Sequence, residues 1–261
     1  MASSKTGGKN MKIATINQRC VWNKDGEQSF IHRGIFLCDK IESEKPDVIG
    51  FQEVTPLTLP VLKRLLPEYE FVGQFRSENY DSEGLYTAVR KETCDFLGFE
   101  TIWLSPTPYV AGSRFEEQSK YPRICLEAKI RHRQSGTVFR LYNLHLDHIS
   151  DKARTLGIEA ALRFVDSFKA DGAPVVILGD FNAEPGSETI KICEARKDLR
   201  CLTTHIPVTF HGYGKRDALK IDYIYMSHEL ANHVTKTEPW TDSINGIYLS
   251  DHYPICAELD V

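Results

Sequence analysis

Three acidic residues follow short apolar runs, and this pattern constrains the fold more than any other feature of the chain. The run 174–178 (PVVIL) leads into Gly179-Asp180-Phe181-Asn182, the run 47–51 leads into Gln52-Glu53, and Ser250-Asp251-His252 carries a third acid. Apolar runs of this length between polar segments are typical of buried strands. Hydrolytic sites are commonly built from polar side chains held at the ends of rigid elements. The pattern therefore predicts a site assembled where core strands end.

Three more polar residues stand at the tips of predicted strands. Asn17 follows Ile13-Ala14-Thr15-Ile16, His145 follows Leu141-Tyr142-Asn143-Leu144, and Asp222 lies in the run 221–225. Taken singly, each is as typical of a turn, a helix cap or a surface ion pair. Their joint occurrence with the three acids favours a functional site.

The length and charge of the chain limit its organisation and its partners. A chain of 261 residues with 41% hydrophobic content can bury one large core, so we expect a single domain over residues 11–261. Residues 1–10, which are rich in Gly, Ser and Lys, are expected to be a disordered tail or a cloning remnant. The formal net charge of −4 argues against a grip on long duplexes through many phosphates.

Cysteine usage and hydropathy indicate the compartment. The seven cysteines are odd in number and form no Cys-x-x-Cys pair, which argues against a disulfide framework or a zinc knuckle. No apolar run approaches 18 residues, and the first ten residues lack the hydrophobic stretch of a secretory signal. These features predict a reduced, cytoplasmic protein with no membrane partner.

Hydrophobic periodicity predicts an α+β or α/β chain in which helices cover mainly antiparallel sheets. Strands are predicted over 11–17, 47–53, 69–75, 85–90, 96–103, 124–131, 138–145, the run ending at Asp180, 221–226, 233–237 and 253–259. Helices are predicted over 31–44, 57–66, 151–169 and 187–195.

The acids at these strand ends suit a hard divalent cation. Mg²⁺ or Mn²⁺ prefers oxygen ligands and retains several waters, so Glu53 and Asp251 fit it better than any sulfur or multi-histidine set. Asp180 offers a carboxylate that can orient a water and take its proton, and Asn182 offers an amide that can position that water.

Histidines complete the predicted chemistry. His252 and His145 can stabilise negative charge on phosphoryl oxygens, and Asp222 can hold one nitrogen of His252 and so define its tautomer. The stretch His145-Leu146-Asp147-His148 also permits a two-histidine metal clip. Strand alternation would place these two histidines on opposite faces, so we expect only His145 to be functional.

In this order, the motifs resemble those of the endonuclease/exonuclease/phosphatase superfamily, which has the deoxyribonuclease-I-like fold. They span residues 11–261 and are Asn17, Gln52-Glu53, the stretch 143–148, Gly179-Asp180-Phe181-Asn182, Ile221-Asp222-Tyr223-Ile224 and Ser250-Asp251-His252. Four further features resemble a bacterial branch grouped with deadenylase and nocturnin-like metallohydrolases: Trp103-Leu104-Ser105-Pro106-Thr107-Pro108, the stretch 145–148, Arg154 and Thr209-Phe210-His211-Gly212.

The resemblance implies a four-layer α/β/β/α sandwich of two mainly antiparallel sheets with a site at one edge. It makes Glu53 the main metal carboxylate, with Asn17 and Asp251 on the metal or its waters. It also assigns water activation jointly to Asp180 and His252.

The remaining implied roles concern phosphate contact. His145 is implied to touch the scissile phosphate, and Arg123 and Arg154 are implied substrate contacts. The chain departs from the abasic-site endonuclease branch, because Arg19 stands where that branch has an acid. It also shows no membrane-binding hairpin of the secreted sphingomyelinase type.

The expected function is hydrolysis of a phosphodiester or phosphomonoester by metal-assisted attack of water. Candidate substrates are single-stranded RNA or DNA and nucleotides. The aromatic residues Trp22, Tyr80, Trp103, Tyr109 and Phe115 are candidates for stacking a base, and most of them fit hydrophobic plugs or ordinary surface residues equally well. Inositol phosphates, sugar phosphates and lipid phosphates are alternatives that use the same catalytic residues. A non-catalytic binding module is a further alternative, against which the presence of Glu53, Asp180, Asn182 and His252 argues.

Overall fold

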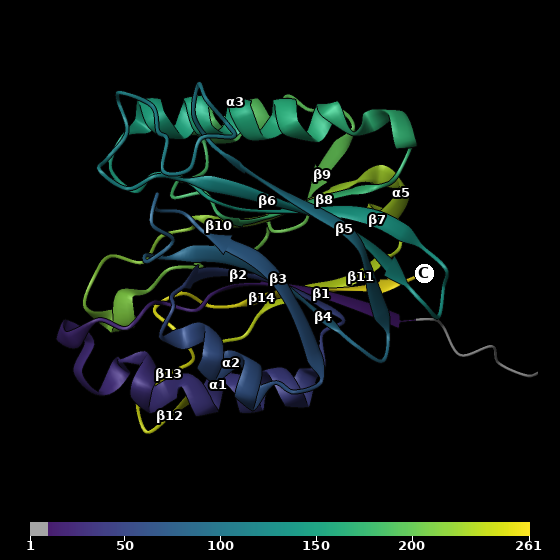
Figure 1. The fold of residues 1–261 in the computed structure, drawn as a ribbon. Coiled ribbons are helices and arrows are strands. Elements are labelled where there is room, and N and C mark those ends of the chain that lie inside the picture. The colour runs from purple at the N-terminus through teal and green to yellow at the C-terminus, as the bar shows by residue number, and fades with distance from the viewer. Residues whose placement is uncertain (1–9) are drawn as a thin grey trace, which may run out of the picture.

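Two six-stranded sheets lie face to face between outer layers of helices (Figure 1). The structure, a computed structural model, describes residues 10–261. The four layers confirm the expected α/β/β/α sandwich. The first residue of the expected N-terminal tail that is described, Asn10, already belongs to a strand, and the rest of that tail lies outside the described residues.

The first sheet is built from both ends of the chain. Its strands are β1 (Asn10–Asn17), β2 (Val48–Val54), β3 (Tyr69–Phe75), β4 (Gly84–Arg90), β11 (Val234–Pro239) and β14 (Ile255–Asp260). Their order is β11-β14-β1-β2-β4-β3, and only the pair β1 and β2 is parallel.

The second sheet contains the middle of the chain. Its strands are β5 (Cys94–Trp103), β6 (Ile124–His132), β7 (Val138–His145), β8 (Val175–Asp180), β9 (Leu199–Cys201) and β10 (Asp222–Ser227). Their order is β5-β6-β7-β8-β10-β9, and only the pair β7 and β8 is parallel.

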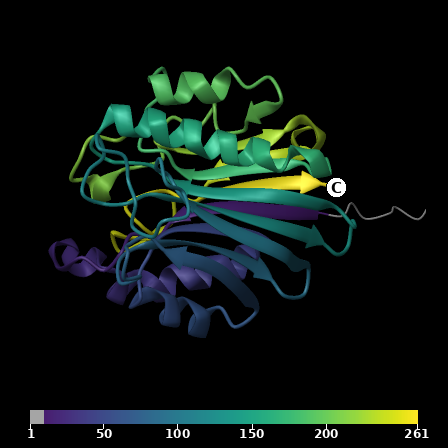
Figure 2. The same cartoon turned by 45° about the horizontal axis from the view of Figure 1, so that its top comes forward.

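Helices cover the outer face of each sheet. They are α1 (Phe30–Glu44), α2 (Thr58–Leu65), α3 (Asp151–Ser167), α4 (Glu188–Glu194) and the short α5 (His228–Ala231), with 3-10 turns η1 (Asn23–Gln28), η2 (Lys169–Asp171) and η3 (Gly212–Gly214). Helices α1 and α2 lie below the first sheet in Figure 1, and α3 lies above the second. Figure 2 brings α4, the green helix, into view beside α3.

Alternation along the strands divides the interior into three apolar layers. In β8, Val176 and Leu178 pack between the sheets against residues such as Ile13 of β1, whereas Ile177 packs outward against α3 and α4. A third layer joins α1 and α2 to the outer face of the first sheet through residues such as Leu37. Strands buried on both faces explain why their sequences are continuous apolar runs rather than alternating ones.

The two parallel pairs position the site. Helix α1 connects β1 to β2, and α3 connects β7 to β8, so each pair is a β-α-β crossover. Parallel strands end at the same edge of a sheet, and this brings Asn17 level with Gln52 in one sheet and His145 level with Asp180 in the other. Both edges lie at the left-hand end of Figure 1.

The predicted elements agree with the structure except for short ones. Strands β3 and β7 have the predicted bounds, while β9, α5, η1 and the two-stranded hairpin β12 (Ser243–Ile244) and β13 (Ile247–Tyr248) were not predicted. These elements are too short to show an apolar period. The hairpin nevertheless had a local sequence signal, the pair Asn245-Gly246, which favours a tight hairpin turn. Both residues have positive φ angles in the structure, of 53° and 79°.

Among residues 10–261, the structure has free cysteines and no membrane-spanning helix. All seven cysteines are free thiols, and only Cys201 is partly exposed. Within residues 10–261, no helix combines the length and apolar character that crossing a membrane requires.

Gly179 links strand packing to the site, because it directly precedes Asp180. Its φ is 139°, and a Cβ there would lie 1.9 Å from the carbonyl oxygen of Leu144 on β7. Gly179→Ala is therefore expected to lower the free energy of unfolding by about 3 kcal/mol or more in a urea titration. Gly98→Ala is the control, since a Cβ at Gly98 meets nothing within 4 Å, and should change stability by less than about 0.5 kcal/mol. Equal stability of the two variants would contradict the prediction.

Candidate active site

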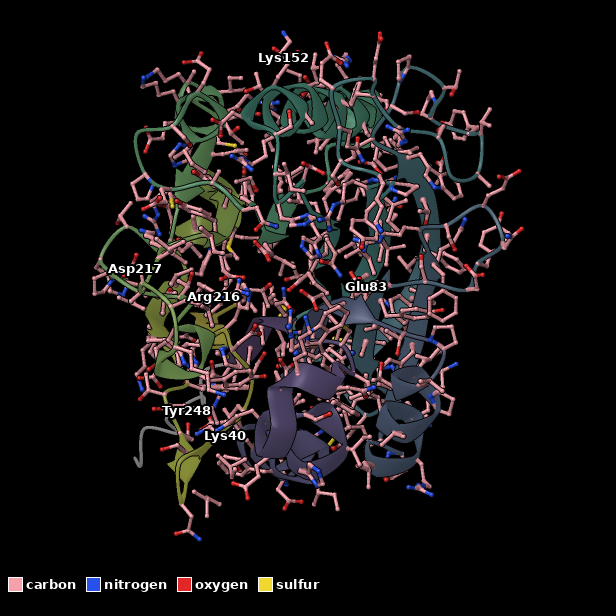
Figure 3. All side chains as sticks on the ribbon, turned by 90° about the vertical axis from the view of Figure 1, so that its left-hand side faces the viewer. Lys40, Glu83, Lys152, Arg216, Asp217 and Tyr248 are labelled. Carbon is pink, nitrogen blue, oxygen red and sulfur yellow. The ribbon has the colours of Figure 1, made fainter. Side chains whose placement is uncertain are left out.

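The predicted polar residues come from both sheets and gather at one end of the sandwich. Figure 3 views that end and shows Glu83 at mid-height between the outer helix layers. The strand ends of β1, β2, β7 and β8 meet the start of β10 there, together with the loop that carries Asp251 and His252.

Glu53 and Asn17 connect the first sheet to the second. The side-chain amide of Asn17 donates to Glu53 Oε1 at 3.2 Å and to Asp180 Oδ2 at 3.0 Å. Glu53 Oε2 accepts the backbone N–H of Cys20 at 3.0 Å. Burial tends to raise the pKa of Glu53, but Arg19 and the Cys20 N–H outweigh it and lower the pKa to about 2. Glu53 is therefore an ionised carboxylate, and it is half-buried.

The pKa of Asp180 is raised, whereas the pKa of Glu53 is lowered. It is 2% exposed, and burial together with the nearby Asp222 raises its pKa to about 7. Its Oδ1 accepts the backbone N–H of Asn182 at 2.8 Å. The side-chain amide of Asn182 donates to the carbonyl of Leu146 at 3.1 Å. Asn182 has a φ of 49°, which turns the chain sharply after β8.

A line of three side chains crosses the centre of the site. Asp222 Oδ2 lies 2.8 Å from His252 Nδ1, and His252 Nε2 lies 3.8 Å from Asp180 Oδ2. Burial opposes a charge on His252, but Asp222 and Asp180 raise its pKa to about 10. His252 is therefore an imidazolium held between two carboxylates, with Asp222 defining its orientation.

His145 and Asp251 lie on either side of this line. His145 Nε2 is 3.4 Å from Asp180 Oδ2, and burial beside Arg123 lowers the pKa of His145 well below its usual value. Asp251 Oδ1 is 4.0 Å from His252 Nε2, and Asp251 Oδ2 is 3.6 Å from Arg19 Nε. Burial and the neighbouring Glu53 raise the pKa of Asp251.

The two predicted substrate-binding arginines have different surroundings. Arg123 is 4% exposed and lines a small pocket together with His145. Arg154 lies in the first turn of α3, where its guanidinium donates to the carbonyl of Asp147 at 2.9 Å and pairs with Asp151. The structure thus brings Arg123 to His145, while the described contacts of Arg154 hold the start of α3.

His148 does not follow the strand alternation assumed from the sequence, because β7 ends at His145. Its Nδ1 lies 3.0 Å from Arg123 Nη2. A guanidinium only donates, so Nδ1 of His148 accepts this hydrogen bond and the ring is neutral. The contact couples His148 to Arg123 rather than to the central carboxylates.

Two residues expected to be available for base stacking are in the core instead. Trp103 is 4% exposed and donates its indole N–H to the carbonyl of Arg76 at 2.7 Å, and Phe115 is 8% exposed under α3. The stacking prediction is wrong for these two, because burial removes their ring faces. Trp22, Tyr80 and Tyr109 are exposed.

Five residues of the site were not predicted from the sequence as site residues: Arg19, Cys20, Arg33, Arg76 and Glu83. Arg33 is fully buried and donates to the carbonyls of Gln18, Arg19, Gln28 and Leu249, so it ties the end of β1 to the segment before Ser250. A signal existed in its spacing, since Arg33, Leu37 and Ile41 lie on one helix face. The others depend on contacts between distant segments.

The donor set fits a hard divalent cation at Glu53. Glu53 is ionised, and the carboxylate of Glu83 lies within 4.8 Å of it. The Cys20 sulfur lies within the same limit, but burial raises the pKa of this thiol, so it stays protonated and is no ligand for a hard cation. Asp180, Asp222 and His252 form a second group within the same limit. In the structure Asn17 turns its amide N–H groups toward the carboxylates, while its oxygen accepts the N–H of Arg19 at 3.0 Å. An oxygen ligand from Asn17 requires the amide to turn over.

This fold and site define a phosphoester hydrolase of the deoxyribonuclease-I-like type. Residues 28–252 match the Endonuclease/Exonuclease/phosphatase family, and the chain belongs to that family. Family members are hydrolases of phosphoester bonds and depend on divalent metal ions. The expected family and fold are thereby confirmed.

Individual relatives are distant in sequence but close in structure. An endonuclease/exonuclease/phosphatase from Bacteroides vulgatus is 26% identical with a TM-score of 0.87, covering 97% of this chain and 99% of that one. The mannosyl-6-phosphatase Bt3783 of Bacteroides thetaiotaomicron is 23% identical with a TM-score of 0.85, covering 95% and 99%. Nocturnin from Drosophila melanogaster is 26% identical over 168 residues, which are 59% of this chain but 24% of Nocturnin.

Proposed function

We propose that this protein is a Mg²⁺- or Mn²⁺-dependent phosphoesterase that cleaves a P–O bond by attack of water. The observation that carries the proposal is the line Asp222–His252–Asp180 beside the ionised Glu53. A buried carboxylate with a pKa near neutrality next to an oriented imidazolium is the pairing that general acid–base hydrolysis needs.

Glu53 is the main ligand for the cation in this proposal, with Asp251 and Asn17 holding the cation or its waters. When bound, the cation supplies positive charge against the phosphoryl oxygens. Arg19 supports the arrangement because it lies 3.6 Å from Asp251 and pairs with Asp25 at 3.0 Å, which keeps Asp251 oriented toward the site.

Asp180 and His252 share the proton transfers. Asp180 accepts a proton from the attacking water, because its raised pKa makes it a base near neutral pH. Asn182 positions this carboxylate through its backbone N–H. His252 donates a hydrogen bond through Nε2 to negative charge that builds on the phosphate, while Asp222 retains the proton on Nδ1.

His145 and Arg123 contact the phosphate in this scheme. His145 is neutral, so one ring nitrogen can donate to a phosphoryl oxygen without repelling Arg123. Arg123 supplies a guanidinium, the side chain best suited to phosphate oxygens. Arg154 is proposed to reach substrate only as a second contact at the mouth of the site, since its guanidinium already holds α3.

The substrate is proposed to be a phosphate ester on a small molecule or on the end of a single strand, with nucleotides and RNA or DNA ends as candidates. A sugar phosphate is the second candidate, which the likeness to a protein named a mannosyl-6-phosphatase favours. The net charge of −4 also favours substrates other than a long duplex.

The test is a hydrolysis screen with Mg²⁺ or Mn²⁺ over single-stranded RNA and DNA, nucleotides, sugar phosphates and inositol phosphates. The protein and an Asp180→Asn variant are compared on each substrate. We expect turnover of at least one class, with a loss of about a hundredfold in the variant, because asparagine cannot take the proton. Absence of any Asp180-dependent turnover would refute the phosphoesterase proposal and leave a binding module.

A further inference from the structure

A small pocket beside the proposed catalytic residues is lined by two buried arginines, one directly after β3 of the first sheet and one directly before β6 of the second. Arg76 is 6% exposed and Arg123 is 4% exposed, and both line the pocket with Glu83 and His145. Arg76 Nε and Arg123 Nε and Nη1 are buried and have no hydrogen-bond partner among residues 10–261. Buried N–H groups of charged side chains are seldom left unpaired, so these donors indicate an anionic ligand.

The backbone holds both arginines rigidly. Arg76 extends the β3–β4 ladder by one residue, with its N–H donating to the carbonyl of Glu83 at 2.9 Å and its carbonyl accepting from the Trp103 indole at 2.7 Å. Arg123 precedes β6, and its carbonyl accepts the N–H of Leu104 at 2.7 Å. Strand ends from two sheets therefore form a preorganised pair of cations.

Neighbouring side chains orient the guanidinium groups toward the pocket. The Tyr121 ring lies 5.1 Å from the Arg76 guanidinium carbon, and its centroid is 5.9 Å from that of His148. His148 in turn takes only the Nη2 edge of Arg123. Glu83 pairs with Arg76 Nη2 at 2.7 Å and is the one acid lining the pocket. Two cations and one anion line the pocket, so one guanidinium is left to pair with a ligand anion, while the ionised Glu53 lies within 4.8 Å of Glu83 but does not line the pocket.

We propose that Arg76 and Arg123 bind the transferred phosphate as a dianion, and that this pocket makes the enzyme selective for phosphomonoesters. The inference rests on the proposed function, which leaves monoesters and diesters open. A terminal phosphate carries up to two negative charges and three free oxygens, whereas a diester phosphate carries one charge and two free oxygens. The pocket has a volume of only about 10 Å³ between buried walls such as Leu85 and Ile124, so it can take one free phosphoryl oxygen but has no room for a second ester group.

The pocket adjoins the proposed catalytic residues. His145 lines it and lies 3.4 Å from Asp180 Oδ2, so a phosphate held by the arginines is adjacent to the carboxylate that activates water. Arg76 is therefore a specificity-determining residue, and Glu83 competes with phosphate for its guanidinium.

The experiment combines binding and kinetics. Inorganic phosphate binding to the metal-free protein is measured by calorimetry, and kcat/KM is measured with p-nitrophenyl phosphate and bis(p-nitrophenyl) phosphate. Arg76→Gln is expected to weaken phosphate binding and monoester kcat/KM about tenfold or more, and diester kcat/KM by less than about threefold. Arg90→Gln, on the same hairpin at its far end, should change neither quantity by more than about twofold.

A second variant tests whether the carboxylate of Glu83 competes with phosphate for Arg76. Glu83→Gln removes the competing carboxylate and is expected to tighten phosphate binding about threefold or more. A purely structural role for the Arg76–Glu83 pair predicts weaker or unchanged binding, and either result would overturn the proposal. Equal losses on both esters in Arg76→Gln would also overturn it while leaving the phosphoesterase function intact. Arg76-dependent phosphate binding without hydrolysis of any ester would support the pocket and refute the proposed function.

Discussion

Replacing Glu53 with glutamine is expected to lower kcat/KM by about a hundredfold or more at a fixed low concentration of Mg²⁺. Glutamine has nearly the same shape, but it has one acceptor oxygen, so it can keep the hydrogen bond from Asn17 or the one from Cys20, which use different oxygens of Glu53. It lacks the negative charge that the low pKa of Glu53 maintains, and a hard cation depends on that charge. The loss should therefore be one of metal affinity more than of folding.

The measurement is activity against Mg²⁺ concentration, together with direct metal binding by calorimetry. Part of the lost activity should return at high Mg²⁺ if Glu53 is a ligand. Glu70→Gln is the control, because Glu70 is exposed on β3 of the same sheet. An unchanged Mg²⁺ dependence in Glu53→Gln would assign the metal to other residues.

His252→Ala is expected to reduce kcat by about a hundredfold to ten-thousandfold. The imidazolium lies between Asp222 and Asp180, so its removal leaves two buried carboxylates facing each other without the intervening charge. Asp180 would then hold its proton more tightly, because the His252 charge no longer lowers its pKa. The base would be lost together with the charge stabiliser, and the pH at which remaining activity appears should rise.

A double-mutant cycle with Asp222→Asn tests whether the pair acts as a unit. The double variant should be no more than about threefold slower than His252→Ala, since Asp222 acts through the imidazole. Additive losses would show that the two residues work independently. His32→Ala serves as the control, because His32 is exposed on α1.

The strand-end residues show what a local sequence pattern can predict about the site. Val175–Asp180 reads as a buried strand because five neighbouring apolar residues precede the acid, and the structure has β8 over that range. The same logic located Asn17, Glu53 and His145 at strand ends. Their distances from one another were not in the pattern, and their catalytic roles stay predictions.

Other features were decided by contacts between distant segments. Strand alternation predicts His145 and His148 on opposite faces of one strand, but β7 ends at His145, and the chain then turns so that His148 contacts Arg123. Trp103 and Phe115 were candidates for exposed stacking, yet packing buries both. An aromatic residue has the same sequence signature at a binding face and in a core, so only tertiary burial separates the two.

The sequence by itself determined the longer strands and helices of this protein, the family motifs, and the set of acids, amides and histidines at its strand ends. These follow from periodicities and motifs that the order of residues carries directly. Only the tertiary structure decided that Arg76, next to the end of β3, and Arg123, next to the start of β6, line one pocket with His145. Which strand ends meet depends on how two twisted sheets pack, and that packing is set by the whole core rather than by any one segment.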